Sequence, residues 1–257
     1  MTGAAAIAVE ESGRAGDPPV VLVHGSMDRM TGMAKLARRL AATCHVIRYD
    51  RRGYGRSVPH PGPFGIEAQV ADLCSIVDGR RCVLVGHSYG GDVVLAFADR
   101  HPELVAALAV YEVPLSWQPW WPGTTAGAAA TQGEPAAAAE GFMRRMIGDQ
   151  LWERLPERTR AARRAEGPAL IGELVDLRSR EPWTPERIVC PVVAGCGELG
   201  EAHHRRGTAW IASVVPGATQ VVLTGCRHGA HAGDPEQFAE RLVRPALASV
   251  GWISDHG

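Results

Sequence analysis

Short apolar runs alternate with amphipathic stretches along the first half of the chain. Runs such as Pro19–Val23 and Val105–Tyr111 are typical of strands that are buried on both faces. Residues 33–42 carry apolar side chains at positions 33, 36, 37, 40 and 41, the spacing of a helix with one buried face. The same patterns predict further strands over 44–49 and 81–85, and further helices over 66–77 and 89–99. This alternation favours an α/β fold in which a mostly parallel, doubly wound sheet has helices on both faces.

The strand pattern stops between residues 113 and 187. This stretch begins with the tryptophan- and proline-rich Ser116–Pro122, continues through an alanine- and glycine-rich region, and becomes helical over 142–155. A structureless loop of ~75 residues inside a compact domain is improbable, so we expect an inserted helical cap or lid over 113–187. The core domain would comprise residues 1–112 and 188–257. Within its second part we expect strands over 191–196 and 220–223 and helices over 204–214 and 235–250.

Composition excludes several classes of protein. Hydrophobic residues make up 46% and charged residues 21%, the range of a globular protein. The 27 basic and 28 acidic residues give a net charge of −1, so no bulk positive charge favours a nucleic-acid partner. No apolar run approaches the roughly 18 residues of a membrane span, and Met1–Glu11 lacks the basic start of a secretory signal. We therefore expect a cytoplasmic protein with no membrane partner and reduced cysteines.

The motif with the clearest chemistry is Gly86-His87-Ser88-Tyr89-Gly90. It follows an apolar strand and begins an apolar helix, which is the context that a G-x-S-x-G nucleophile turn requires. Glycines at 86 and 90 let the crossing backbones approach, and the turn lifts the Ser88 hydroxyl clear of the sheet. The helix N-terminus also favours negative charge beside it. The sequence thus predicts that Ser88 is a nucleophile; the alternative is a serine that only caps the helix.

Over nearly its whole length the chain resembles the α/β-hydrolase-fold proteins, in particular members with a serine nucleophile. The resemblance depends on His24-Gly25 after a strand, on Asp50-Arg51-Arg52-Gly53-Tyr54-Gly55-Arg56-Ser57, on the Ser88 turn and on a late histidine. It implies that the backbone N–H groups of Ser26 and Tyr89 bind the oxyanion. We interpret the segment Asp50–Ser57 as a structural turn beneath the site.

A serine hydroxyl needs a base, and the resemblance assigns this role to His228. This histidine follows the last strand and precedes the final helix that Pro235 begins, the spacing usual in the family. His231 is the alternative. Four other histidines are expected to be structural or solvated: His24 and His87 as parts of backbone motifs, and His203 and His204 as solvated side chains.

The acid of the triad is not where the family usually has it. That position, about nine residues beyond Pro191, is Gly200 in this chain. Another known location is the end of the strand after the nucleophile helix, where Glu112 ends an apolar run. A carboxylate there needs a partner, because an unpaired buried charge is costly. We expect Glu112 to be the acid, with Glu198 as the alternative.

These residues together predict a cofactor-independent serine hydrolase with no metal, which cleaves an ester or related acyl bond of a small hydrophobic substrate. An aspartate at position 88 would instead indicate a dehalogenase or epoxide hydrolase. The insertion offers an apolar pocket lining, although such side chains can equally form its core: Trp117, Trp120, Trp121 and Met146. Other activities of the same site stay open, namely thioesterase, lyase or perhydrolase, as does a binding protein without turnover. The sequence leaves substrate identity and oligomeric state open.

Overall fold

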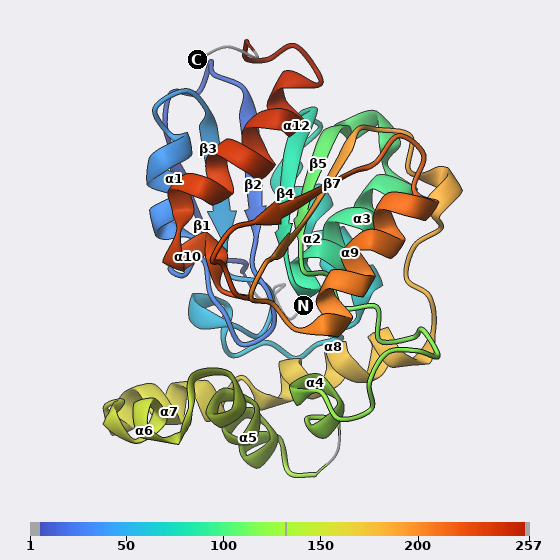
Figure 1. Cartoon of the computed structure of the whole chain (residues 1–257). Helices are drawn as coiled ribbons and strands as arrows, with labels where there is room; N and C mark the ends of the chain where they lie inside the picture. Colours follow the sequence, from blue (N-terminus) through green and yellow to red (C-terminus); the bar gives the residue numbers. More distant parts are fainter. Residues whose placement is uncertain (1–5, 132, 255–257) are drawn as a thin grey trace.

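The computed structural model describes residues 6–131 and 133–254, and a seven-stranded sheet forms its centre (Figure 1). The strand order is β1-β3-β2-β4-β5-β6-β7, and every neighbouring pair is parallel except β1 with β3. The strands are β1 (Val9–Ser12), β2 (Pro19–Val23), β3 (His45–Tyr49), β4 (Cys82–His87), β5 (Val105–Tyr111), β6 (Val192–Gly197) and β7 (Thr219–Leu223). The expected α/β fold with a mostly parallel sheet is confirmed.

Helices cover both faces of the sheet, which explains the uninterrupted apolar runs of its strands. Along β2, Val21 and Val23 pack on one face while Val20 and Leu22 pack on the other. The first face is covered by α2 (Ile66–Val77), α3 (Tyr89–Arg100) and α9 (Ala202–Val214). The second is covered by α1 (Ala34–Leu40), α11 (Pro235–Phe238) and α12 (Arg244–Ala248).

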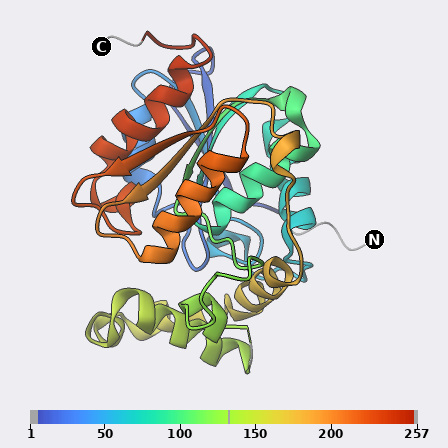
Figure 2. The same ribbon diagram turned by 45° about the vertical axis from the view of Figure 1, so that its right-hand side comes forward.

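Between β5 and β6 the described chain forms helices and no strand. We call residues 113–187 the helical segment; it contains α4 (Ala126–Ala129), α5 (Pro135–Ile147), α6 (Asp149–Arg154), α7 (Glu157–Arg164) and α8 (Gly167–Ser179). Figures 1 and 2 both show α5 to α7 apart from the sheet, at one end of the molecule. The segment packs on the core through a cluster in which buried Trp152 joins Met27 and Tyr54.

Three elements differ from the sequence expectation. Strand β1 was not expected; it is short and half-buried at the sheet edge, so its apolar pattern is weak. The helix expected over 142–155 is two helices, because Gly148 between them adopts a φ of +84°. The closing helix contains a π-helical turn over Ala239–Val243 between α11 and α12. In the described part of the chain, every helix is too short or too polar to cross a membrane.

Candidate active site

Ser88 occupies the sharp turn between β4 and α3. Its backbone has φ 53° and ψ −128°, a conformation that costs a non-glycine residue free energy and that is common at functional sites. The turn is held from both sides: the Ser88 N–H donates to the Tyr111 carbonyl at 2.9 Å, and the Gly91 N–H donates to the Ser88 carbonyl at 2.7 Å. The Ser88 side chain is half-buried. Because its backbone is held on both sides, its Cβ has a fixed position at the end of β4.

The glycines around Ser88 are required by close backbone contacts. A Cβ on Gly86 would lie 2.6 Å from the Gly90 carbonyl oxygen, and one on Gly90 would lie 2.2 Å from the Val23 carbonyl oxygen. A Cβ on Gly25 would lie 2.8 Å from the Cβ of Ser88 itself. The motif's small residues thus bring β2, β4 and α3 together at the serine.

Glu112 ends β5 and faces His228. The Glu112 side chain is fully buried, and its φ of 47° is again in the left-handed region. Its Oε2 accepts a hydrogen bond from His228 Nδ1 at 2.7 Å, and its Oε1 accepts one from the Gly197 N–H at 2.9 Å. Because an ionised carboxylate only accepts, Nδ1 of His228 carries the proton and Nε2 is left with a lone pair. This is the arrangement that a general base needs.

The glycine at position 200 makes room for this carboxylate. A Cβ there would lie 2.2 Å from Glu112 Oε1, so a side chain at 200 and the carboxylate of Glu112 compete for one space. The alternative acid, Glu198, is exposed and accepts a hydrogen bond from the Gly225 N–H at 2.8 Å. Of the two carboxylates weighed from the sequence, Glu112 is the one that contacts His228.

The His228 loop is anchored to the residues beside the serine turn. His87 Nε2 donates to the His228 carbonyl at 2.8 Å, and their ring centroids are 4.7 Å apart. The Tyr111 hydroxyl donates to the Arg227 carbonyl at 3.0 Å. Among the described residues no hydrogen bond joins the Ser88 hydroxyl to His228; catalytic hydrogen bonds commonly close only when substrate is bound.

The two expected oxyanion donors lie on either side of the turn. Tyr89 is the first residue of α3, where backbone N–H groups have no partner within the helix. Ser26 follows His24-Gly25 in the loop after β2, and its N–H donates to no other described residue. Both N–H groups are therefore available to an oxygen atom at the end of β4.

The alternative base, His231, belongs to a different pair. It is buried, and its Nε2 donates to Asp28 Oδ2 at 3.1 Å. Burial alone would raise the pKa of Asp28, but the hydrogen bond and charge of His231, together with smaller contributions from His24 and the Arg29 N–H, outweigh it, and the pKa falls to about 2. Within residues 6–131 and 133–254, two sets of side chains have donor atoms close enough to share a metal ion, Asp28–His87–His231 and Glu112–His204–His228. Each already contains a hydrogen-bonded carboxylate–imidazole pair.

Trp121 of the helical segment is linked to the candidate base His228 by two histidines of α9. Trp121 meets the rings of His203 and His204 edge-on, at 4.7 and 5.4 Å between centroids. His204 in turn stacks on His228 at 4.8 Å. The expectation that His204 is solvated was therefore wrong, because it is half-buried between two aromatic neighbours.

The other expected lining residues lie elsewhere. Trp117 packs edge-on against Trp183, and Trp120 lies beneath the guanidinium of Arg206. Met146 is 44% exposed, because the buried face of α5 is formed by other residues, among them Met143. We therefore leave Met146 out of the candidate pocket.

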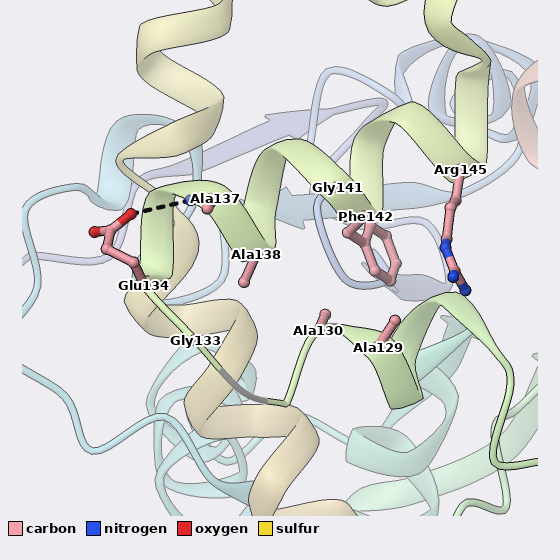
Figure 3. A pocket seen from close by; sticks show the side chains of 9 residues that line it. All are labelled: Ala129, Ala130, Gly133, Glu134, Ala137, Ala138, Gly141, Phe142 and Arg145. Atoms are coloured by element: carbon pink, nitrogen blue, oxygen red, sulfur yellow. Dashed lines mark hydrogen bonds between the residues drawn. The ribbon is translucent and has the colours of Figure 1, made fainter.

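A separate hollow lies within the helical segment, between α4 and α5 (Figure 3). Its volume is about 240 Å³, and Arg145 extends beside it with its guanidinium at one end. Small residues form most of its wall, namely Ala129, Ala130, Gly133, Ala137, Ala138 and Gly141, and Glu134 and Phe142 complete it. None of the candidate catalytic residues borders it.

Comparisons with known proteins identify the family of the chain. The alpha/beta hydrolase family matches residues 20–241. Epoxide hydrolase 4 of Mus musculus is 30% identical over 108 residues, 40% of this chain and 30% of that protein. The 2-hydroxy-6-oxo-2,4-heptadienoate hydrolase of Pseudomonas putida is 40% identical over 99 residues, 36% of each chain. The chain thus matches about a third of the length of these two relatives.

A solved structure shares the fold over almost the whole chain. An esterase from Thermogutta terrifontis has a TM-score of 0.74 at 23% sequence identity, over 95% of this chain and 93% of that one. Since the family match covers well over half of the sequence and the sheet has the same architecture, the resemblance to the α/β-hydrolase fold is confirmed. The chain belongs to the alpha/beta hydrolase family.

Proposed function

We propose that this protein is a serine hydrolase that cleaves an ester or related acyl bond through Ser88, His228 and Glu112. The observation that carries the proposal is the 2.7 Å hydrogen bond between His228 Nδ1 and the buried carboxylate of Glu112, in a loop anchored next to the Ser88 turn. This bond fixes the imidazole tautomer that leaves Nε2 free to take a proton.

The reaction follows from these positions. As Ser88 Oγ attacks the carbonyl carbon, its proton passes to His228 Nε2, and the Ser26 and Tyr89 N–H groups bind the oxyanion. The C–O bond of the ester then breaks, and His228 gives the proton to the departing alcohol. Water attacks the acyl-enzyme with His228 again as base, which releases the acid and restores the serine. Glu112 stays ionised and stabilises the imidazolium in both halves.

The substrate class is indicated by the serine at position 88 and by the aromatic residues packed near His228. A serine forms an ester intermediate, which suits acyl transfer rather than epoxide opening. We further propose that the helical segment acts as a cap whose Trp121, packed against His203 and His204, gives the site an apolar wall. A small hydrophobic acyl or aromatic group fits such a wall.

Steady-state kinetics on p-nitrophenyl esters test the proposal. We expect the Glu112→Gln variant to lose about 10²- to 10⁴-fold in kcat, because a neutral amide no longer holds the productive tautomer. Glu198→Gln is the matched control, since among the described residues its carboxylate bonds only to the Gly225 backbone, and it should retain kcat within about 3-fold.

Either of two results would contradict the triad. One is a larger loss in Glu198→Gln than in Glu112→Gln. The other is wild-type turnover in Ser88→Ala. A wild-type protein that binds small hydrophobic esters without turning over esters, thioesters or lactones would instead indicate a binding protein.

A further inference from the structure

Arg51 places a fully buried cation beside the candidate oxyanion site. Its Nη1 donates to Glu173 Oε2 at 2.8 Å, and both side chains have no exposed surface. Its Nε donates to the His24 carbonyl at 2.8 Å, and its Nη2 donates to the Gly25 carbonyl at 3.1 Å. Removing an ion from water costs roughly several kcal/mol. A buried guanidinium that binds two carbonyls next to the candidate site therefore calls for a functional explanation.

The Gly25 carbonyl belongs to the same peptide unit as the Ser26 N–H. In a trans peptide the C=O and N–H vectors point in opposite directions within one plane. A guanidinium that binds the carbonyl side therefore turns the N–H toward the opposite side. A positive charge there also draws electron density from the peptide, which makes its N–H a stronger donor.

His24 holds the same carbonyl from a second direction. Burial, with a further contribution from Arg51, lowers the pKa of His24 to about 3, so the ring is neutral. Its Nε2 accepts from the Arg51 N–H at 2.9 Å, which leaves Nδ1 with the proton that it donates to the Gly25 carbonyl at 2.8 Å. The peptide between Gly25 and Ser26 is thus fixed by two side-chain donors, besides the Asp28 N–H, which donates to the same carbonyl at 3.4 Å.

The guanidinium also lies against the second expected oxyanion residue. The carbon atom at its centre is 4.8 Å from the centroid of the Tyr89 ring and 4.9 Å from that of Tyr54. Arg51 therefore contacts the ring of Tyr89, the residue whose backbone N–H is the second expected donor, as well as the carbonyl of the Gly25–Ser26 peptide.

The helical segment supplies the anion that keeps Arg51 in place. Glu173 lies on α8, and the Tyr54 hydroxyl donates to its Oε1 at 2.6 Å, so both carboxylate oxygens are bound. A second contact comes from α7, where Arg163 Nη1 donates to the Met27 carbonyl at 3.0 Å, one residue beyond Ser26. Two helices of the segment therefore hold the loop that carries the Ser26 N–H.

We propose that Arg51 is a positioning residue for the oxyanion site: held by Glu173 of the helical segment, it orients the Gly25–Ser26 peptide for catalysis. The inference rests on the proposed serine-hydrolase function, because it gives the Ser26 N–H a role in that reaction. The inference predicts that a change in how the helical segment packs on the core changes how strongly the site binds an oxyanion.

The test compares two double variants that each remove one ion pair. In Arg51→Met/Glu173→Gln both charges leave together, so no unpaired charge stays buried. The matched control is Arg52→Met/Asp72→Asn, because Arg52 is the next residue and its Nε and Nη2 bond Asp72 at 2.7 Å, away from the loop. Circular dichroism establishes that each protein is folded. The readouts are kcat and KM on p-nitrophenyl butyrate and the inhibition constant of an aryl trifluoromethyl ketone, which binds serine hydrolases as a tetrahedral oxyanion.

We expect the Arg51 and Glu173 double variant to lose about 10- to 100-fold in kcat, somewhat less than deletion of an oxyanion donor, with KM within about 3-fold of wild type. Affinity for the ketone should fall by the same factor as kcat/KM, because both report binding of the oxyanion. The Arg52 and Asp72 control should keep wild-type values. A purely structural role would lower the melting temperature and leave kcat and ketone affinity of the folded protein unchanged, which would overturn the proposal.

Arg51→Lys decides the matter if the double variant does not fold. Lysine keeps the charge beside Glu173 but lacks the planar fork that reaches both carbonyls. We expect a reduced kcat and ketone affinity; wild-type values in this variant would overturn the proposal. If the wild-type protein itself neither hydrolyses esters nor binds the ketone, the proposed function fails and this inference fails with it. Active wild type with unaffected variants refutes the inference alone.

Discussion

Replacing Gly200 with alanine tests how the acid is placed. The added Cβ would lie 2.2 Å from Glu112 Oε1 and 3.0 Å from the Gly197 carbonyl oxygen. A carbon and an oxygen atom need more than 3 Å, so the carboxylate has to move by about 1 Å. The backbone of Gly200 lies outside the left-handed region, so alanine brings no conformational strain of its own.

This displacement weakens the contact on which the proposed mechanism depends. Oε1 and Oε2 belong to one rigid carboxylate, so moving Oε1 away from the Cβ also moves Oε2 relative to His228. A hydrogen bond to a charged group is worth about 1.5–3 kcal/mol. If that free energy is lost from the transition state, kcat falls by roughly 10- to 100-fold.

A double-mutant cycle attributes the loss to the carboxylate. The assay measures kcat on a p-nitrophenyl ester for wild type, Gly200→Ala, Glu112→Ala and the double variant. Without the Glu112 carboxylate the alanine has nothing to displace, so the second substitution should cost less than about 2-fold. Gly229→Ala is the control, because a Cβ at Gly229 meets no atom within 4 Å although it adjoins His228. Wild-type kcat in Gly200→Ala, or an equal loss in both backgrounds, would refute this reasoning.

Two further predictions concern stability. The pKa of Asp28 is depressed in the folded state to about 2, so its pairing with His231 stabilises the protein above the unfolded pKa of 3.8, and this stabilisation is lost as pH falls through about 2. Urea unfolding at pH 6, 4 and 2.5 gives the free energy of unfolding of wild type and of Asp28→Asn. The difference between the two proteins should shrink by about 2 kcal/mol from pH 6 to pH 2.5, and a difference that stays constant with pH would contradict the pairing. Gly90→Ala should lower the free energy of unfolding by about 3 kcal/mol, because the new Cβ meets a backbone carbonyl at 2.2 Å; an unchanged melting temperature would contradict the close packing of the turn.

Local patterns were enough to predict most of the core. The apolar runs at Pro19–Val23 and Val105–Tyr111 are strands with the expected bounds, because a central strand of a parallel sheet is buried on both faces. The helix over Ile66–Val77 also has the expected bounds. Such elements are specified by neighbouring residues. Strand β1 was missed because an edge strand shows one weakly buried face and little apolar periodicity.

The site could be predicted only in part. Ser88, His228 and Glu112 could be predicted as candidates because a motif, a spacing and a carboxylate ending an apolar run each leave a local signal. The role of Gly200 was not visible, because a glycine does not reveal which atom occupies its missing side chain. Arg51 was expected in a structural turn, since its partner Glu173 is 122 positions away along the chain. A contact of that separation leaves no trace in periodicity or composition.

The central claim is that Ser88 is a reactive nucleophile, and covalent labelling tests it most directly. Wild-type protein is incubated with a fluorophosphonate probe, and the adduct is located by peptide mass spectrometry. The account predicts one adduct, on the oxygen of Ser88, that is absent in Ser88→Ala and strongly slowed in His228→Ala. No adduct on the folded wild-type protein, or an adduct on another residue that persists in Ser88→Ala, would contradict it.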